Sequence, residues 1–218
     1  MKKNFLLLGM LLVGAALSAQ ISIKAGLNFA NMVFEEKDEN IEDLVDDGGP
    51  KLMAGVAFIL PLGKQHLLAL QPEVMYIRKG SQSMYTILNE TYSNDLTYDY
   101  IDVPLLLRFS LGDSYGEGLG IYLNAGVYGG YALGGRTTLE TPLGTVKETL
   151  TFDAADDQRR IDFGFVGGAG LALGNIFLEV RYLHGTNNLL DDDADNTNNG
   201  DFSKLQHRGV GLTAGITF

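Results

Sequence analysis

One alternating pattern recurs eight times along this chain of 218 residues. In the last copy, one set of residues is apolar and the other is glycine or threonine: Val210, Leu212, Ala214, Ile216 and Phe218 against Gly209, Gly211, Thr213, Gly215 and Thr217. Successive side chains of a β-strand point to opposite faces. Strands with one apolar and one polar face, repeated round a sheet, are typical of a barrel that is apolar outside and polar inside. The pattern therefore predicts an all-β fold, an eight-stranded antiparallel up-and-down transmembrane β-barrel.

The alternation also gives the order of strands and connections. The predicted strands are 21–32, 52–60, 67–79, 96–109, 120–133, 160–173, 176–184 and 209–218. The connections near 33–51, 80–95, 134–159 and 185–207 are long and polar, whereas those at 61–66, 110–119 and 174–175 are short. Membrane barrels have long loops outside and short turns on the periplasmic side. Both termini are therefore expected on the side of the short turns.

Two features bear on the register of three predicted strands. The second strand is unusually apolar on its inner face, which carries Met53, Gly55, Ala57 and Ile59. Pro72 and Pro104 lie within predicted strands, where a proline removes a hydrogen-bond donor from the ladder. We expect local irregularities near bulges at both prolines.

The N-terminus has the pattern of a secretory signal. Lys2 and Lys3 precede an apolar run at 5–17, and the small residues Ser18 and Ala19 follow it. The alternative is a membrane anchor, but the run is shorter than the roughly 20 apolar residues that cross a bilayer as a helix. Residues 1–19 are therefore predicted to be a cleaved signal peptide, and residues 20–218 a single barrel domain.

Charge and cysteine content exclude some classes of protein. The formal charge is −11, and removing Lys2 and Lys3 makes it −13. This acidic balance argues against a nucleic-acid partner, which requires a basic surface. The acidic stretches at 35–43 and 191–195 fall in predicted loops. The chain has no cysteine and so forms no disulfide.

A soluble eight-stranded cup of the lipocalin type is the structural rival, because alternation alone does not say which face is inside. Such a cup turns its larger apolar residues inward. Here the apolar face carries Phe, Leu, Ile and Val on every strand, whereas the opposite face is rich in glycine and tyrosine. A narrow barrel accommodates small residues inside and bulk outside, which favours the membrane barrel. Aromatic residues near predicted strand ends suit interfacial belts: Phe109, Tyr131, Tyr182 and Phe218.

Seven charged residues fall on the predicted inner faces: Lys24, Glu73, Asp102, Arg108, Asp162, Glu179 and Arg181. Three positive and four negative charges nearly balance. Charges in a confined interior persist when they are paired and hydrogen-bonded, and side chains can fill an eight-stranded interior. These residues therefore predict an ion-paired plug in the lumen and no open pore.

Several segments resemble the PorT-like outer-membrane β-barrel family of Gram-negative bacteria. They are 71–76 (QPEVMY) with 79–80 (KG), 100–108 (YIDVPLLLR), 125–128 (AGVY), 164–170 (GFVGGAG), 179–182 (EVRY) and the terminal Phe218. The resemblance implies an eight-stranded barrel in outer-membrane lipid, inserted by the barrel-assembly machinery. That machinery recognises a last strand ending in an aromatic residue, here Phe218. The family takes its name from a component of a protein secretion system, so a secretion-complex partner is also implied.

Catalytic and metal-binding alternatives rest on few residues. His66 falls in a predicted turn, and His184 is expected on the lipid-facing side of its strand. His207 is expected to face inward, where it could meet Ser203 or an aspartate of its loop. A hydrolytic site in such a barrel needs a histidine near a carboxylate and often a serine at the outer rim. A lone rim histidine is more often a polar cap. One loop is rich in the oxygen ligands of calcium, with Asp191, Asp192, Asp193, Asp195, Asn196, Asn198, Asn199 and Asp201. Its spacing does not match an EF-hand, and a solvated loop is the ordinary interpretation.

The chain is thus predicted to be a non-enzymatic outer-membrane barrel without a cofactor, acting as a structural or interaction protein through its acidic loops. A surface protein would be its partner. The alternatives are a subunit of a secretion or assembly complex, a small-solute channel and a rim enzyme.

Overall fold

The alternating segments form nine β-strands within the described residues of the computed structural model, which are 20–36, 49–63, 67–87, 90–112, 118–142, 144–150, 160–188 and 202–218. The strands are β1 (Gln20–Glu36), β2 (Pro50–Leu62), β3 (Leu68–Ile87), β4 (Glu90–Gly112), β5 (Leu119–Thr141), β6 (Gly144–Leu150), β7 (Ile161–Leu173), β8 (Ile176–Gly185) and β9 (Phe202–Thr217). No helix in this part of the chain is long and apolar enough to cross a membrane.

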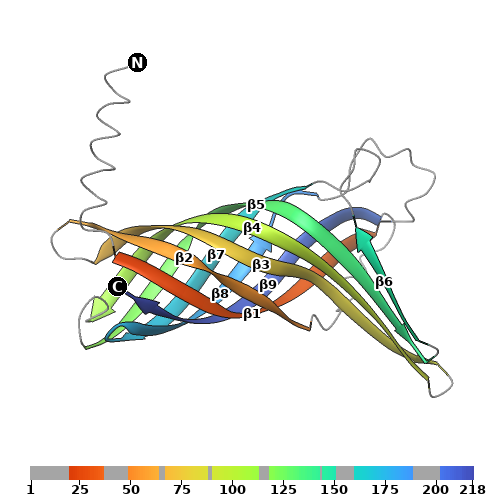
Figure 1. Ribbon diagram of the computed structural model, residues 1–218. Coiled ribbons are helices and arrows are strands. Elements are labelled where there is room, and N and C mark those ends of the chain that lie inside the picture. The colour runs from red at the N-terminus through yellow and green to blue at the C-terminus, as the bar shows by residue number, and fades with distance from the viewer. Residues whose placement is uncertain are drawn as a thin grey trace.

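Eight of the strands pair in a closed ring (Figure 1). Every pairing is antiparallel, and the order is β1–β2–β3–β4–β5–β7–β8–β9 and back to β1. The C-terminal Phe218 donates its backbone N–H to the carbonyl of Ile21 at 2.8 Å, beside the point where β9 meets β1. The predicted all-β, up-and-down eight-stranded architecture is confirmed.

The wall of the ring is apolar outside and polar inside. On β5, Ile121, Leu123 and Val127 are each at least 50% exposed, whereas Tyr122 and Asn124 between them are buried. The same alternation holds on β2, where Met53, Ala57 and Ile59 are buried as expected. A soluble cup hides its large aliphatic residues. The exposed aliphatic wall therefore excludes that rival and matches a lipid-facing surface.

The strand count and several strand ends differ from the prediction. The connection expected at 80–95 is mostly strand, because β3 and β4 stay paired as far as Ile87 and Glu90. The connection expected at 134–159 contains the end of β5 and the whole of β6. Residues 135–141 of β5 pair with residues 144–150 of β6. The last strand begins at Phe202 where 209 was predicted, and β1 continues to Glu36 beside it. These segments mix polar and apolar residues without sustained alternation, so they carry no clear period-two hydropathy signal.

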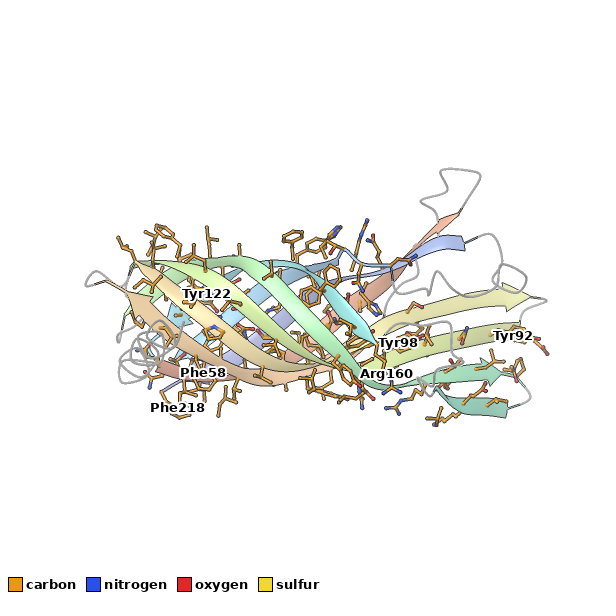
Figure 2. The ribbon with its side chains drawn as sticks, turned by 90° about the horizontal axis from the view of Figure 1, so that it is seen from above. Phe58, Tyr92, Tyr98, Tyr122, Arg160 and Phe218 are labelled. Atoms are coloured by element: carbon orange, nitrogen blue, oxygen red, sulfur yellow. The ribbon has the colours of Figure 1, made fainter. Side chains whose placement is uncertain are left out.

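The extended segments form a four-stranded sheet that projects beyond the ring, in the order β3–β4–β5–β6. Figure 1 shows β6 at the end of the molecule opposite the C-terminus. In Figure 2 the paired ends of β1 and β9 diverge from this sheet. Gly80 lies where β3 leaves the ring and has φ of 138°, a conformation that residues with a Cβ rarely adopt.

The prolines interrupt the ladder without shifting it. The β2–β3 pairing stops at Ala57↔Glu73 and resumes at Leu60↔Leu70 in the same register, on either side of Pro72. The β3–β4 pairing is interrupted in the same way opposite Pro104. The register shift within the ring lies instead between β4 and β5 at Asp99/Tyr100, so the bulges expected at the prolines were wrong.

Candidate functional site

The lower lumen contains a cluster of four charged side chains, each no more than 2% exposed. Lys24 on β1 donates to Glu73 on β3 at 2.6 Å and to Glu179 on β8 at 3.4 Å. Arg181 on β8 donates to Glu73 through Nη1 at 2.9 Å and also pairs with Glu179. Two positive and two negative charges are thus satisfied within one group. This group is called the lower ion cluster.

Neutral donors complete the hydrogen bonding of the lower ion cluster. Tyr122 and Asn124, both on β5, donate to Oε2 of Glu179 at 3.1 and 3.0 Å. Gln71 donates to Oε1 of Glu73 at 2.6 Å. Carboxylates that accept several hydrogen bonds tolerate burial far better than unpaired ones.

Arg108 lies beside this cluster and is linked to it through Gln71. Its guanidinium donates to Gln71 at 3.3 Å and to Ser110 at 3.2 Å. Its Cζ lies 3.6 Å from the ring centroid of Tyr122, in the geometry of a cation–π contact. These contacts place an aromatic face and two neutral side chains beside the charge.

A second cluster lies nearer the projecting sheet and centres on Lys79, which the sequence reasoning did not include. Lys79 Nζ pairs with Asp102 and Asp162, each at 2.8 Å. It also lies 4.5 Å from the ring centroid of Tyr100 and 4.6 Å from that of Tyr128. Lys79 has the same inward parity as Gln71 and Glu73, so continuing the alternation along β3 would have found it. This group is called the upper ion cluster.

An apolar layer separates the two clusters. On β3, Met75 and Ile77 lie between Glu73 and Lys79, and both are fully buried. They belong to one contiguous packed group: Met53, Met75, Ile77, Leu106, Tyr128, Val166 and Leu183. Side chains therefore occupy the lumen in three layers, ionic, apolar and ionic.

The structure describes only some of the residues considered for catalysis or calcium binding. His207 is buried and faces inward as predicted, with its ring against Tyr98 and Tyr100 at centroid distances of 6.1 and 5.4 Å. For Ser203 the structure describes the backbone but not the side chain. His66 and residues 191–201 lie outside the described residues. In the described part of the chain, no three acidic or histidine side chains are grouped as a metal site.

A polar groove of about 300 Å³ lies at the base of the projecting sheet. Its walls are the start of β2 and the paired segments of β3, β4 and β5: Pro50, Lys51, Leu52, Arg78, Gln82, Ser93, Asp95, Thr97, Arg136, Thr138 and Glu140. Sequence reasoning assigned most of these positions to loops. The extended strands place them on one surface.

Two ion pairs hold the groove in shape. Lys51 Nζ donates to Asp95 at 2.8 Å and to Thr97 at 3.0 Å. Arg78 Nε donates to Asp99 at 2.9 Å, and the hydroxyl of Tyr76 donates to the same carboxylate. Asp95 lies on the projecting sheet, outside the lipid-facing wall. Partial burial raises the pKa of Asp95, but the hydrogen bonds from Lys51 and Thr97 and the nearby positive charges outweigh it, and the net pKa is below its ordinary value.

The aromatic residues expected at the membrane boundaries all face outward. Phe109 and Phe218 are 39% and 70% exposed, and Tyr131 and Tyr182 are 48% and 47% exposed. Figure 2 shows Phe218 and Phe58 toward the end of the barrel opposite the projecting sheet, whereas Tyr92 lies near the tip of that sheet.

Several solved structures are similar to this chain over most of its length, each at low sequence identity. Ail, the attachment invasion locus protein of Yersinia pestis, solved with the heparin analogue sucrose octasulfate, is 12% identical, with a TM-score of 0.41 over 92% of this chain and 99% of Ail. Neisserial surface protein A is 11% identical, with a TM-score of 0.40 over 92% and 97%. The outer membrane enzyme PagL is 12% identical, with a TM-score of 0.33 over 90% and 98%.

No curated protein sequence matches the chain. The family model described as "Outer membrane protein beta-barrel domain" matches residues 14–191, which is most of the chain. The family match, the closed ring of strands and the apolar outer wall all indicate a barrel of the Gram-negative outer membrane. The chain therefore belongs to the outer membrane protein β-barrel domain family.

Proposed function

We propose that this barrel is a non-enzymatic interaction protein, in which the wall anchors a projecting sheet that binds a protein partner outside the cell. The observation that carries the proposal is the four-stranded β3–β6 sheet, which continues past the ring at the end away from the C-terminus. The short turn at Gly174 and Asn175 lies at the other end, as periplasmic turns do in membrane barrels. This orientation turns the projecting sheet outward.

The sheet has a form suited to protein recognition. β6 pairs with β5 along one edge, and the described side chains of β6 are all exposed. An exposed strand edge can accept a further strand from a partner through main-chain hydrogen bonds. The acidic segments at 35–43 and 191–195 are proposed to add charge selectivity around it.

A layered lumen supports an anchor better than a channel. Lys24 and Arg181 each bind two carboxylates across the interior, and Met75 and Ile77 pack above them. We therefore expect no stepwise conductance from the refolded barrel in planar bilayers. Reproducible unit conductance would overturn the closed lumen and revive the small-solute channel.

The alternative is a subunit of a protein secretion or assembly complex, which the resemblance of 71–76 and 100–108 to PorT-like barrels favours. Both interpretations need a protein partner, but they differ in stoichiometry. A complex subunit would co-purify with partners at a fixed ratio without crosslinking. A surface-binding protein would capture its partner only through the projecting sheet.

The decisive experiment compares the intact chain with a variant that lacks the outer hairpin. Residues 137–148 are replaced by Asn-Gly, which can join the paired Arg136 and Thr149 in a two-residue turn. The β5–β7 pairing ends at Tyr131↔Ile161, so the ring does not depend on this hairpin. After crosslinking in intact cells and purification in mild detergent, the partner should be present with the intact chain and absent with the variant. Equal recovery from both would contradict the proposal.

A further inference from the structure

Arginines follow the apolar residues on the outward face of several strands, toward the projecting sheet. On β9, the outward residues Leu212 and Val210 are followed by Arg208, and on β3 the outward Val74 and Tyr76 are followed by Arg78. The four arginines at this boundary are Arg78, Arg136, Arg160 and Arg208, called the arginine belt. Figure 2 shows Arg160 where the ring passes into the projecting strands.

The arginine belt occurs at one end of the barrel. At the other end, the outward side chains that the structure describes are uncharged: Leu62, Leu68, Leu111, Leu119, Leu173, Ile176 and Phe218. The chain as a whole is acidic, with a formal charge of −11. The two boundaries therefore differ: arginines, with Asp99 paired to Arg78, mark one of them, and uncharged residues mark the other.

The polar groove gives this belt a defined binding site. Asp95 is paired with Lys51 and Asp99 with Arg78. Arg136 lies 3.9 Å from Asp99, beyond hydrogen-bond distance, and its side chain is 51% exposed. Its guanidinium can therefore donate to a ligand in the groove. Leu52 also lines the groove and is 47% exposed, so the groove opens beside the apolar wall.

We propose that the groove and the arginine belt bind the phosphorylated sugar head group of lipid A, the glycolipid anchor of the outer leaflet. Arg136 would bind a phosphate in the groove, and Arg160 would bind a second charge at the boundary. Guanidinium groups match phosphate geometry with paired hydrogen bonds. The acyl chains would run along the wall from Leu52. The inference rests on the proposed orientation, in which the projecting sheet is outside.

The test is lipid binding to the refolded mature chain in detergent, measured by native mass spectrometry. The probe is bisphosphorylated lipid A, compared with the same lipid after removal of both phosphates and with phosphatidylglycerol. The variant is Arg136→Gln/Arg160→Gln, and the matched control is Lys147→Gln, which removes a cation from β6 away from the wall. Shifted mobility of the unheated protein on a denaturing gel confirms that each variant is folded.

The expected result is preferential binding of bisphosphorylated lipid A, weakened about tenfold in the double variant and unchanged in Lys147→Gln. Equal binding of lipid A with and without phosphates would overturn the proposal. Equal weakening by Lys147→Gln would replace it with unspecific attraction, and equal binding of phosphatidylglycerol with a general affinity for anionic lipid. Because no protein partner enters this measurement, its failure leaves the proposed protein interaction to be judged separately.

Discussion

Arg181 on β8 and Glu73 on β3 meet across the full width of the barrel, with 2.9 Å between Nη1 and Oε2. These strands face each other in the ring, with β4, β5 and β7 on one side and β2, β1 and β9 on the other. Both side chains are about 1% exposed. The pair therefore ties opposite walls together.

Removing Arg181 is expected to destabilise the barrel strongly. Arg181→Met leaves Glu73 and Glu179 with Lys24 alone, and breaking a buried pair in this way costs about 3–5 kcal/mol. Adding Glu73→Gln returns the lower ion cluster to one positive and one negative charge. The double variant should then lose less unfolding free energy than the two single variants, Arg181→Met and Glu73→Gln, lose in sum. The difference should be at least about 0.5 kcal/mol.

Urea unfolding of the refolded barrel, followed by circular dichroism, measures these energies. Arg136→Met serves as the control, because that side chain is 51% exposed and should change stability by no more than about 0.5 kcal/mol. Strict additivity of the Arg181 and Glu73 variants would mean that the pair contributes no coupling.

A charge on the outer wall is expected to be costly. Leu123 lies near the middle of the outward row of β5 and is 55% exposed. In a soluble protein, Leu123→Arg would change stability by about 0.5 kcal/mol or less, whereas in a bilayer it should cost about 2–4 kcal/mol. Unfolding from lipid vesicles distinguishes the two. Val146→Arg on β6, a 62% exposed position beyond the wall, should be neutral; equal effects at both sites would argue against a lipid-facing wall.

Two glycines in the wall are expected to respond differently to alanine. A Cβ at Gly170 would overlap the ring of Tyr122 in the lumen, whereas nothing lies within 4 Å of a Cβ at Gly129. Gly170→Ala should cost about 1–3 kcal/mol through overpacking, and Gly129→Ala about 0.5 kcal/mol or less. Urea midpoints of the two variants in the same detergent give the comparison. A harmless Gly170→Ala would show that Tyr122 does not fill the lumen at that level.

The projecting sheet should loosen in acid. The pKa of Asp95 is lowered in the folded protein, so its ion pair with Lys51 contributes stability above the unfolded pKa of about 4 and loses it as the pH falls through the folded value. Amide exchange of 51–52 and 93–97, corrected for intrinsic rates, should therefore increase below about pH 4. Asp95→Asn should show that exchange already at pH 6, with little further change. Identical pH profiles for both proteins would rule out Asp95 as the cause.

The inner and outer faces of the wall could be predicted from the sequence because side-chain alternation is a local property of a strand. Leu123 and Tyr122 are neighbours in the chain, and hydropathy alone assigned them to opposite faces. The projecting sheet could not be found this way. Residues such as Ser93, Asp95 and Thr138 are polar on strands that water surrounds, so their composition matches that of a loop.

The partners of the lumen charges also required the tertiary structure. Lys24 and Glu179 are 155 residues apart in the chain, and only closure of the ring brings them within 3.4 Å. Local spacing could not separate Arg108, which packs on Tyr122, from Arg181, which binds two carboxylates. The sequence by itself determined which side chains face the lumen, because a strand alternates with a period of two residues. The tertiary structure decided which of them pair, because strand tilt and register set their heights inside the barrel.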